Sequence, residues 1–157
     1  DLRHVDFRHA DLTDLNLDGF TLDEVDFRTA YFFRTDLRYA SLRFANFEGA
    51  DVRGTLFRNS DLTGANFARC IMPGIDLSRC KLDLANFLGG NLRYAQLTGA
   101  SVIAANFTGV DLRNTKYVDK NRWGAVEARR AMLKSNPTMY VDKKAETLQN
   151  LPDLNTI

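Results

Sequence analysis

The sequence predicts an all-β repeat protein in which the chain turns once in every five residues. Three observations support this fold class. A large apolar residue recurs at every fifth position without an insertion, a small residue usually stands two positions before it, and Asp or Asn often stands directly before it. A period of five matches neither the 3.6-residue period of a helix nor the two-residue period of a strand. The chain must therefore change direction within each unit.

The composition limits the classes of function. The chain has 157 residues, 45% apolar and 26% charged, which suits one globular domain. Its formal net charge of +1 gives no global attraction to nucleic acid, membranes or polyanions. No apolar run is long enough to span a bilayer, so we expect a soluble protein. The chain begins at Asp1 without a Met, so the localisation is unknown: the cytoplasm and export after loss of a leader both fit.

The large apolar residues form the first element, which runs from the start of the chain to about residue 118. They are Leu2, Phe7, Leu12, Leu17, Leu22, Phe27, Phe32, Leu37, Leu42, Phe47, Val52, Phe57, Leu62, Phe67, Met72, Leu77, Leu82, Phe87, Leu92, Leu97, Val102, Phe107, Leu112 and Tyr117. Only a tight interior needs such an alternation with small residues. We therefore expect the large residue and the small residue two positions before it to point inward.

The position before each large residue is rich in Asp and Asn, as at Asp36 and Asn66. These short polar side chains hydrogen-bond to nearby backbone and favour turns. We therefore expect most of these carboxylates and amides to have a structural role rather than a catalytic one.

The repeat resembles that of the pentapeptide-repeat family, whose unit reads Ala, Asp or Asn, Leu or Phe, and two variable residues. Ala65-Asn66-Phe67 and Ala50-Asp51-Val52 follow this unit, and Ala40-Ser41-Leu42 departs from it at one position. The resemblance covers residues 1 to about 118. It implies a right-handed quadrilateral β-helix of about six coils, in which four units make one coil of twenty residues.

Residues that lie twenty positions apart agree with the implied coil. One column consists of Phe7, Phe27, Phe47, Phe67, Phe87 and Phe107. The column before it consists of Asp6, Asp26, Asn46, Asn66, Asn86 and Asn106, and we expect a ladder of side-chain amides there. At a strand spacing of roughly 4.8 Å, the coils would form a rigid rod roughly 28 Å long.

Residues 119–157 form a second region, in which the period of five stops. An amphipathic helix is predicted over 120–135, ending before Pro137, from the apolar spacing of Trp123, Ala125, Val126, Ala128, Ala131, Met132 and Leu133. We expect this region to be a helical cap and tail, because the ends of a stacked helix expose apolar rings and unpaired backbone. A partner-binding helix is the alternative. The N-terminal coil has no such cap, which leaves an upstream segment, a partner or an end-to-end homo-oligomer to cover it.

The sequence carries no catalytic, cofactor-binding or metal-binding motif. His4 and His9 are five positions apart and so fall on adjacent outer faces, which does not build a metal site. Cys70 and Cys80 lie half a coil apart and are expected as small core residues rather than a disulfide. There is no glycine-rich phosphate loop and no Gly-x-Ser-x-Gly elbow. We therefore expect a protein that is not an enzyme and needs no cofactor.

Outward arginines and aromatic residues of the second and third coils form the candidate interaction surface. They are Arg28, Tyr31, Phe33, Arg34, Arg38, Tyr39, Arg43, Phe44, Arg53 and Arg58. The repeat does not require these residues, and arginine and aromatic side chains are enriched at protein interfaces. The alternative is a solvated surface, on which arginines lie over aromatic rings or pair with Asp.

The leading functional hypothesis is a non-catalytic rigid scaffold that binds an unknown protein partner. The resemblance implies a second one, because quinolone-resistance members of the family resemble duplex DNA and bind a type II topoisomerase, gyrase. Such mimicry needs an acidic surface, whereas residues 1–118 contain 14 Lys and Arg against 15 Asp and Glu. Nucleic-acid binding through the arginines is disfavoured by the acids beside them. A fourth hypothesis is a targeting domain of a larger effector protein.

Overall fold

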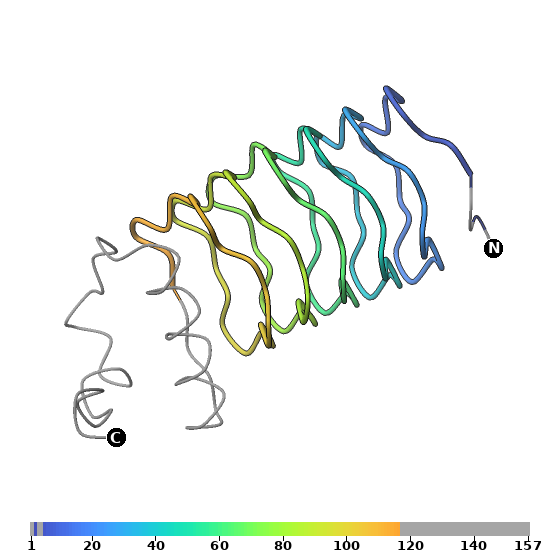
Figure 1. Ribbon diagram of the computed structural model, residues 1–157. Coiled ribbons are helices and arrows are strands. Elements are labelled where there is room, and N and C mark those ends of the chain that lie inside the picture. Colours follow the sequence, from blue (N-terminus) through green and yellow to red (C-terminus); the bar gives the residue numbers. More distant parts are fainter. Residues whose placement is uncertain (1, 3–4, 117–157) are drawn as a thin grey trace, which may run out of the picture.

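The chain winds into a stack of four-sided coils, a quadrilateral β-helix (Figure 1). The computed structural model describes residue 2 and residues 5–116. Parallel β-bridges join residues twenty positions apart, from Asp6 with Asp26 to Gln96 with Lys116. Each bridge is a single residue pair at every fifth position, so the described residues contain no longer strand and no helix. The coil of twenty residues is thereby confirmed.

The large apolar residues define four faces. Face 1 is centred on Phe7, Phe27, Phe47, Phe67, Phe87 and Phe107, and face 2 on Leu12, Phe32, Val52, Met72, Leu92 and Leu112. Face 3 is centred on Leu17, Leu37, Phe57, Leu77 and Leu97, and face 4 on Leu2, Leu22, Leu42, Leu62, Leu82 and Val102. From Leu22 to Leu112 every one of these side chains is buried. The predicted inward positions are confirmed.

The phenylalanines of face 1 form a continuous stack through the core. Neighbouring ring centroids lie between 4.7 and 5.6 Å apart, and the planes of Phe47 and Phe67 differ by 3°. Phe57, from face 3, meets the Phe67 ring edge-on at an angle of 88°. Offset stacks and edge contacts are the favoured arrangements of aromatic rings. The predicted phenylalanine column is therefore confirmed.

Each corner of the coil is a β-turn with one residue in the left-handed backbone region. In the turn that follows Phe27, the N–H of Ala30 donates to the carbonyl of Phe27 at 3.0 Å, and the same bond recurs in every unit from Val5 to Thr115. The second residue after each large residue has φ between +56° and +72° throughout residues 9–114. This combination is the type II turn. Eight of these corner residues are glycine, and the others hold the same backbone with a side chain.

One backbone N–H in each unit is left out of the inter-coil ladder, and in most units an Asp or Asn side chain accepts it. Asp51 Oδ1 accepts the N–H of Arg53 at 3.2 Å, and Asn66 Oδ1 accepts that of Ala68 at 3.1 Å. Pro73 occupies the same position in its unit, where proline's missing N–H leaves no bond unmade. The expected turn-forming role of these side chains is confirmed, because they accept backbone amides that the ladder leaves without a partner.

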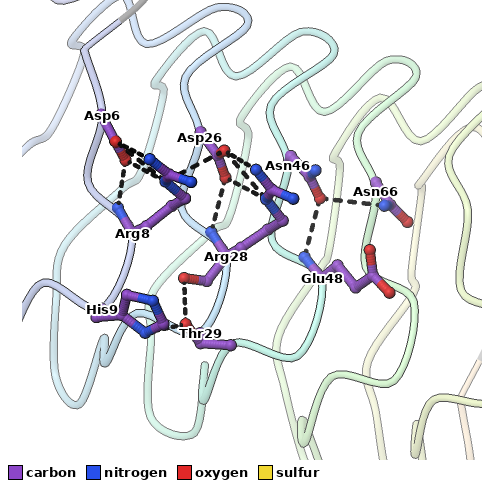
Figure 2. Close-up of polar contacts among 9 residues, drawn as sticks. All are labelled: Asp6, Arg8, His9, Asp26, Arg28, Thr29, Asn46, Glu48 and Asn66. Atoms are coloured by element: carbon purple, nitrogen blue, oxygen red, sulfur yellow. Dashed lines mark hydrogen bonds and ion pairs between the residues drawn. The ribbon is translucent and has the colours of Figure 1, made fainter.

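The amide ladder forms along part of the predicted column. Asn66 Nδ2 donates to Asn46 Oδ1 at 3.1 Å, and the same bond at 3.0 Å joins Asn86 to Asn66 and Asn106 to Asn86. The prediction that Asp6 and Asp26 continue the ladder is wrong: each binds the arginine two residues later, as Figure 2 shows. An ionised carboxylate has no N–H to donate along the column, whereas an amide can donate and accept.

The two cysteines are free and buried, as expected of small core residues. Cys70 Sγ donates to the carbonyl of Phe47 at 2.8 Å, and Cys80 Sγ to that of Phe57 at 3.1 Å. Burial raises the pKa of Cys70 to about 12 and that of Cys80 to about 11. Both thiols therefore stay protonated at neutral pH and are poor nucleophiles.

The predicted C-terminal region, residues 119–157 with its helix over 120–135, lies outside the described residues, as do Asp1, His4 and Tyr117. In the part of the chain that the structure describes, no helical segment has the length and hydropathy of a membrane span.

Candidate interaction surface

The ten residues predicted as an interaction surface do not form one patch. Arg28 lies on face 1; Tyr31, Phe33, Arg34 and Arg53 on face 2; Arg38, Tyr39 and Arg58 on face 3; Arg43 and Phe44 on face 4. Four consecutive units complete one circuit, so residues that are close in the sequence are carried to different sides of the rod. The candidate residues encircle the second and third coils.

Several of these arginines are paired with a carboxylate of their own unit. Arg28 Nη2 lies 2.6 Å from Asp26 Oδ2, as Figure 2 shows, and Arg53 Nη2 lies 2.5 Å from Asp51 Oδ2. The same pair forms at Arg8 with Asp6, Arg38 with Asp36 and Arg113 with Asp111. The hydrogen bonds from Arg28 lower the pKa of Asp26, and those from Arg53 lower that of Asp51. Such exposed pairs add little to the free energy of unfolding, but they hold each guanidinium group against the carboxylate two residues before it.

Face 2 combines aromatic residues with neutralised arginines. Arg34 pairs across the coils with Asp14 at 2.6 Å, and its guanidinium carbon lies 5.3 Å from the centre of the Phe33 ring. Tyr31 and Phe33 are each more than half exposed. These contacts match the alternative of a solvated surface, in which arginines lie over aromatic rings or pair with Asp. This holds for Arg28 on face 1 and for Arg34 and Arg53 on face 2.

Face 3 differs from faces 1 and 2 because two of its arginines form no ion pair among the described residues, a property that Arg43 on face 4 shares. Leu56 stands where the other units commonly have Asp or Asn, and Arg58 follows two residues later. Within residues 5–116, neither Arg58 nor Arg79 has a carboxylate at ion-pair distance. We define the face 3 patch as Arg38, Tyr39, Leu56, Arg58 and Arg79.

The ladder places the members of the face 3 patch on consecutive coils. The N–H of Tyr39 donates to the carbonyl of Arg58 at 3.3 Å, and the N–H of Asn59 to that of Ser78 at 3.2 Å. All five side chains of the patch are exposed, Tyr39 at 64% and Leu56 at 43%. Sequence reasoning named Arg38, Tyr39 and Arg58 but missed Leu56 and Arg79. The twenty-residue register, together with the missing Asp at position 56, could have found them.

The described residues provide no metal centre. No group of three or more His, Cys, Asp or Glu side chains among residues 5–116 is arranged to hold an ion. His9 Nδ1 lies 2.6 Å from Thr29 Oγ1, at the corner between faces 1 and 2 (Figure 2). His4 lies outside the described residues.

Comparison with known proteins agrees with this geometry. A family model for pentapeptide repeats matches the chain in eight copies, over residues 1–38, 22–59, 40–79, 60–93 and 91–116. The chain belongs to the pentapeptide repeat family. No curated protein matches it.

Solved structures of pentapeptide repeat proteins resemble the chain at low sequence identity. A pentapeptide repeat protein from the thylakoid lumen of Arabidopsis thaliana is 26% identical, with a TM-score of 0.60, over 92% of each chain. Rfr23 from the cyanobacterium Cyanothece 51142 is 21% identical, with a TM-score of 0.40, over 68% of this chain and 83% of that one. HetL from Nostoc sp. strain PCC 7120, which is involved in the regulation of heterocyst differentiation, is 23% identical, with a TM-score of 0.35, over 73% and 65%.

Proposed function

We propose that this pentapeptide repeat protein is a non-catalytic scaffold whose rigid sides bind another protein. The observation that carries the proposal is the presence of bulky apolar side chains at exposed corners. Tyr39, Leu84 and Tyr94 are 64%, 58% and 52% exposed. Their φ angles are +56°, +63° and +62°, in the left-handed region.

The corner backbone favours glycine over these residues. For an L-residue with a side chain, the left-handed region costs roughly 1–2 kcal/mol, whereas glycine adopts it freely. Gly19 and Gly99 occupy equivalent corners. An exposed tyrosine or leucine recovers little of that cost from burial, so we infer that its side chain is kept for contact with a partner.

Phe44 is a different case, because its ring packs on the neighbouring coil. A Cβ added at Gly64 would clash with the Phe44 ring, so the ring covers that glycine. Part of the role of Phe44 is therefore structural, and a test of the proposal should leave it in place.

The test is the double variant Tyr39→Gly with Leu84→Gly in the full chain. Because glycine relieves the corner backbone, we expect the melting temperature to stay equal or rise. We expect the affinity for a partner, captured from a source extract, purified and measured by calorimetry, to fall at least about tenfold. Ala104→Gly is the matched control, since Ala104 has the same backbone but a small side chain. Unchanged affinity in the double variant would refute the proposal.

The proposal includes a compartment. The similarity to the Arabidopsis lumen protein extends over 92% of both chains, which supports an exported, lumen-like location. Fractionation of the source cells tests this part separately, and recovery of the protein in the cytosolic fraction alone would contradict it.

The charge distribution does not favour the DNA-mimic alternative. Residues 25–116 carry twelve Lys and Arg against eight Asp and Glu. A mimic of duplex DNA needs regularly placed negative charge along the rod. The targeting domain of a larger effector would use the same lateral surface as a scaffold and is a special case of the proposal.

A further inference from the structure

We infer that the face 3 patch binds an acidic segment of a partner protein. The inference rests on the proposed scaffold function and adds the place and the chemistry of the contact. Backbone bonds from Tyr39 to Arg58 and from Asn59 to Ser78 stack three consecutive coils at this place. The backbone that carries the patch is therefore rigid before any partner arrives, which lowers the entropic cost of binding.

Two of the three guanidinium groups of the patch, those of Arg58 and Arg79, are available to an outside carboxylate. Arg38 is held by Asp36 at 2.6 Å, but Arg58 and Arg79 have no carboxylate at ion-pair distance within the described residues. On faces 1 and 2, by contrast, a partner carboxylate would have to displace an internal one, as at Arg28 with Asp26 and Arg53 with Asp51. Arginine binds carboxylates through two parallel N–H bonds, so Arg58 and Arg79 offer two such sites without loss of an internal pair.

The apolar part of the patch indicates a protein partner. Leu56 forms backbone bridges with Asp36 and Asp76, so it lies between two carboxylate positions of its column. It is 43% exposed, on the same face as Tyr39. Leucine at this position both removes the internal partner of Arg58 and adds exposed apolar area. A partner segment that combines carboxylates with a hydrophobic side chain matches both changes.

A nucleic acid fits the same surface less well. Its phosphates form a continuous line of negative charge. The column of Leu56 also contains the carboxylates of Asp36, which is paired with Arg38, and Asp76, which among the described residues accepts only the N–H of Ser78, at 2.9 Å. The Asp76 carboxylate, which forms no ion pair among the described residues, would repel an unbroken line of phosphates, whereas a protein segment can place its carboxylates selectively opposite Arg58 and Arg79.

The experiment measures binding of short fluorescent peptides to the full chain by anisotropy. One peptide alternates Glu with Leu, the second alternates Gln with Leu, and a single-stranded oligonucleotide of similar length is the third probe. We expect saturable binding of the glutamate peptide that weakens with added salt. The double variant Arg58→Gln with Arg79→Gln should weaken it at least about tenfold. Arg53→Gln, which removes a paired arginine of face 2, is the matched control and should leave it unchanged.

Several outcomes would overturn the inference. They are no saturable binding of the glutamate peptide, equal binding of the glutamine peptide, tighter binding of the oligonucleotide, or an equal loss in the Arg53 variant. Circular dichroism of each variant establishes that the coil is intact. If the peptides fail while the glycine corner variants still lose the captured partner, the scaffold function stands and only the acidic chemistry is refuted.

Discussion

At the scale of the single residue, position within the unit decides what a side chain does. Phe33 and Phe67 have the same chemistry, but the first follows a large residue and is 54% exposed, whereas the second is a large residue and is fully buried. Phe67 lies between the rings of Phe47 and Phe87, with centroids at 4.7 and 5.3 Å. The energetic consequence of losing either ring should differ accordingly.

We expect Phe67→Ala to lower the free energy of unfolding by about 3–5 kcal/mol, because it removes a ring from the middle of the stack and leaves a cavity. Urea unfolding followed by circular dichroism measures the loss. Phe33→Ala is the control and should change the midpoint only slightly. Equal midpoints for the two variants would contradict the assignment of Phe67 to the core.

At the scale of the element, the five-residue unit has one amide that the ladder leaves unused. In most units an Asp or Asn side chain accepts it, and Pro73 removes it. Thr98 occupies this position after Gln96, and its N–H has no partner among the described bonds. Thr108 occupies it after Asn106, whose Oδ1 accepts its N–H at 3.0 Å. A proline at position 108 would therefore remove a hydrogen bond, whereas a proline at position 98 would not.

Thr98→Pro should stabilise the protein by about 0.4–1 kcal/mol, because proline restricts the unfolded chain and suits the first inner position of a type II turn. Thermal unfolding measures the gain. Thr108→Pro breaks a hydrogen bond at the same turn position and should lower the melting temperature. A loss of similar size in both variants would show that the amide of Thr98 is needed after all.

At this scale, the sequence predicts the coil well because each unit repeats the same local geometry. The apolar period and the stacking of Phe7 over Phe27 both follow from it. Whether Asp26 joins the side-chain ladder or accepts hydrogen bonds from Arg28 could not be predicted in the same way, because it depends on which neighbouring side chain donates a hydrogen bond to the carboxylate. The candidate residues lie on four faces because adjacent units along the chain turn to different sides of the rod, and only positions twenty apart share a side. Which arginines are neutralised depends on side-chain conformation, as at Arg34 with Asp14.

At the scale of the whole molecule, each coil contacts only the coils beside it, so the rod is close to one-dimensional. The ladder bonds are the same on every side, but the packed side chains are not. Face 1 carries the phenylalanine stack, and face 4 between Leu22 and Leu82 carries leucines. An inserted segment of five residues therefore keeps the backbone ladder but breaks the columns of stacked side chains. An inserted segment of twenty residues keeps both.

A duplication of residues 50–69 adds one coil and keeps every column continuous, so we expect a melting temperature at or above that of the parent. A duplication of residues 50–54 adds one unit and turns all later residues by one face, which places Phe67 next to Val52. We expect this second variant to keep its β-structure and to melt at a lower temperature. Thermal unfolding followed by circular dichroism measures both. The opposite order would show that the columns contribute little beyond the ladder.

The inward side chains recur at a spacing of five residues without interruption, so the direction of each side chain depends on the number of residues that precede it. Loss of a single residue would move every later inward side chain outward and bring the residues on either side of it inward, with charged groups in the core and phenyl rings in water. Lengthening or shortening of the rod during evolution is therefore expected in whole blocks of five or twenty residues, whereas individual outward side chains are free to be exchanged for new partners.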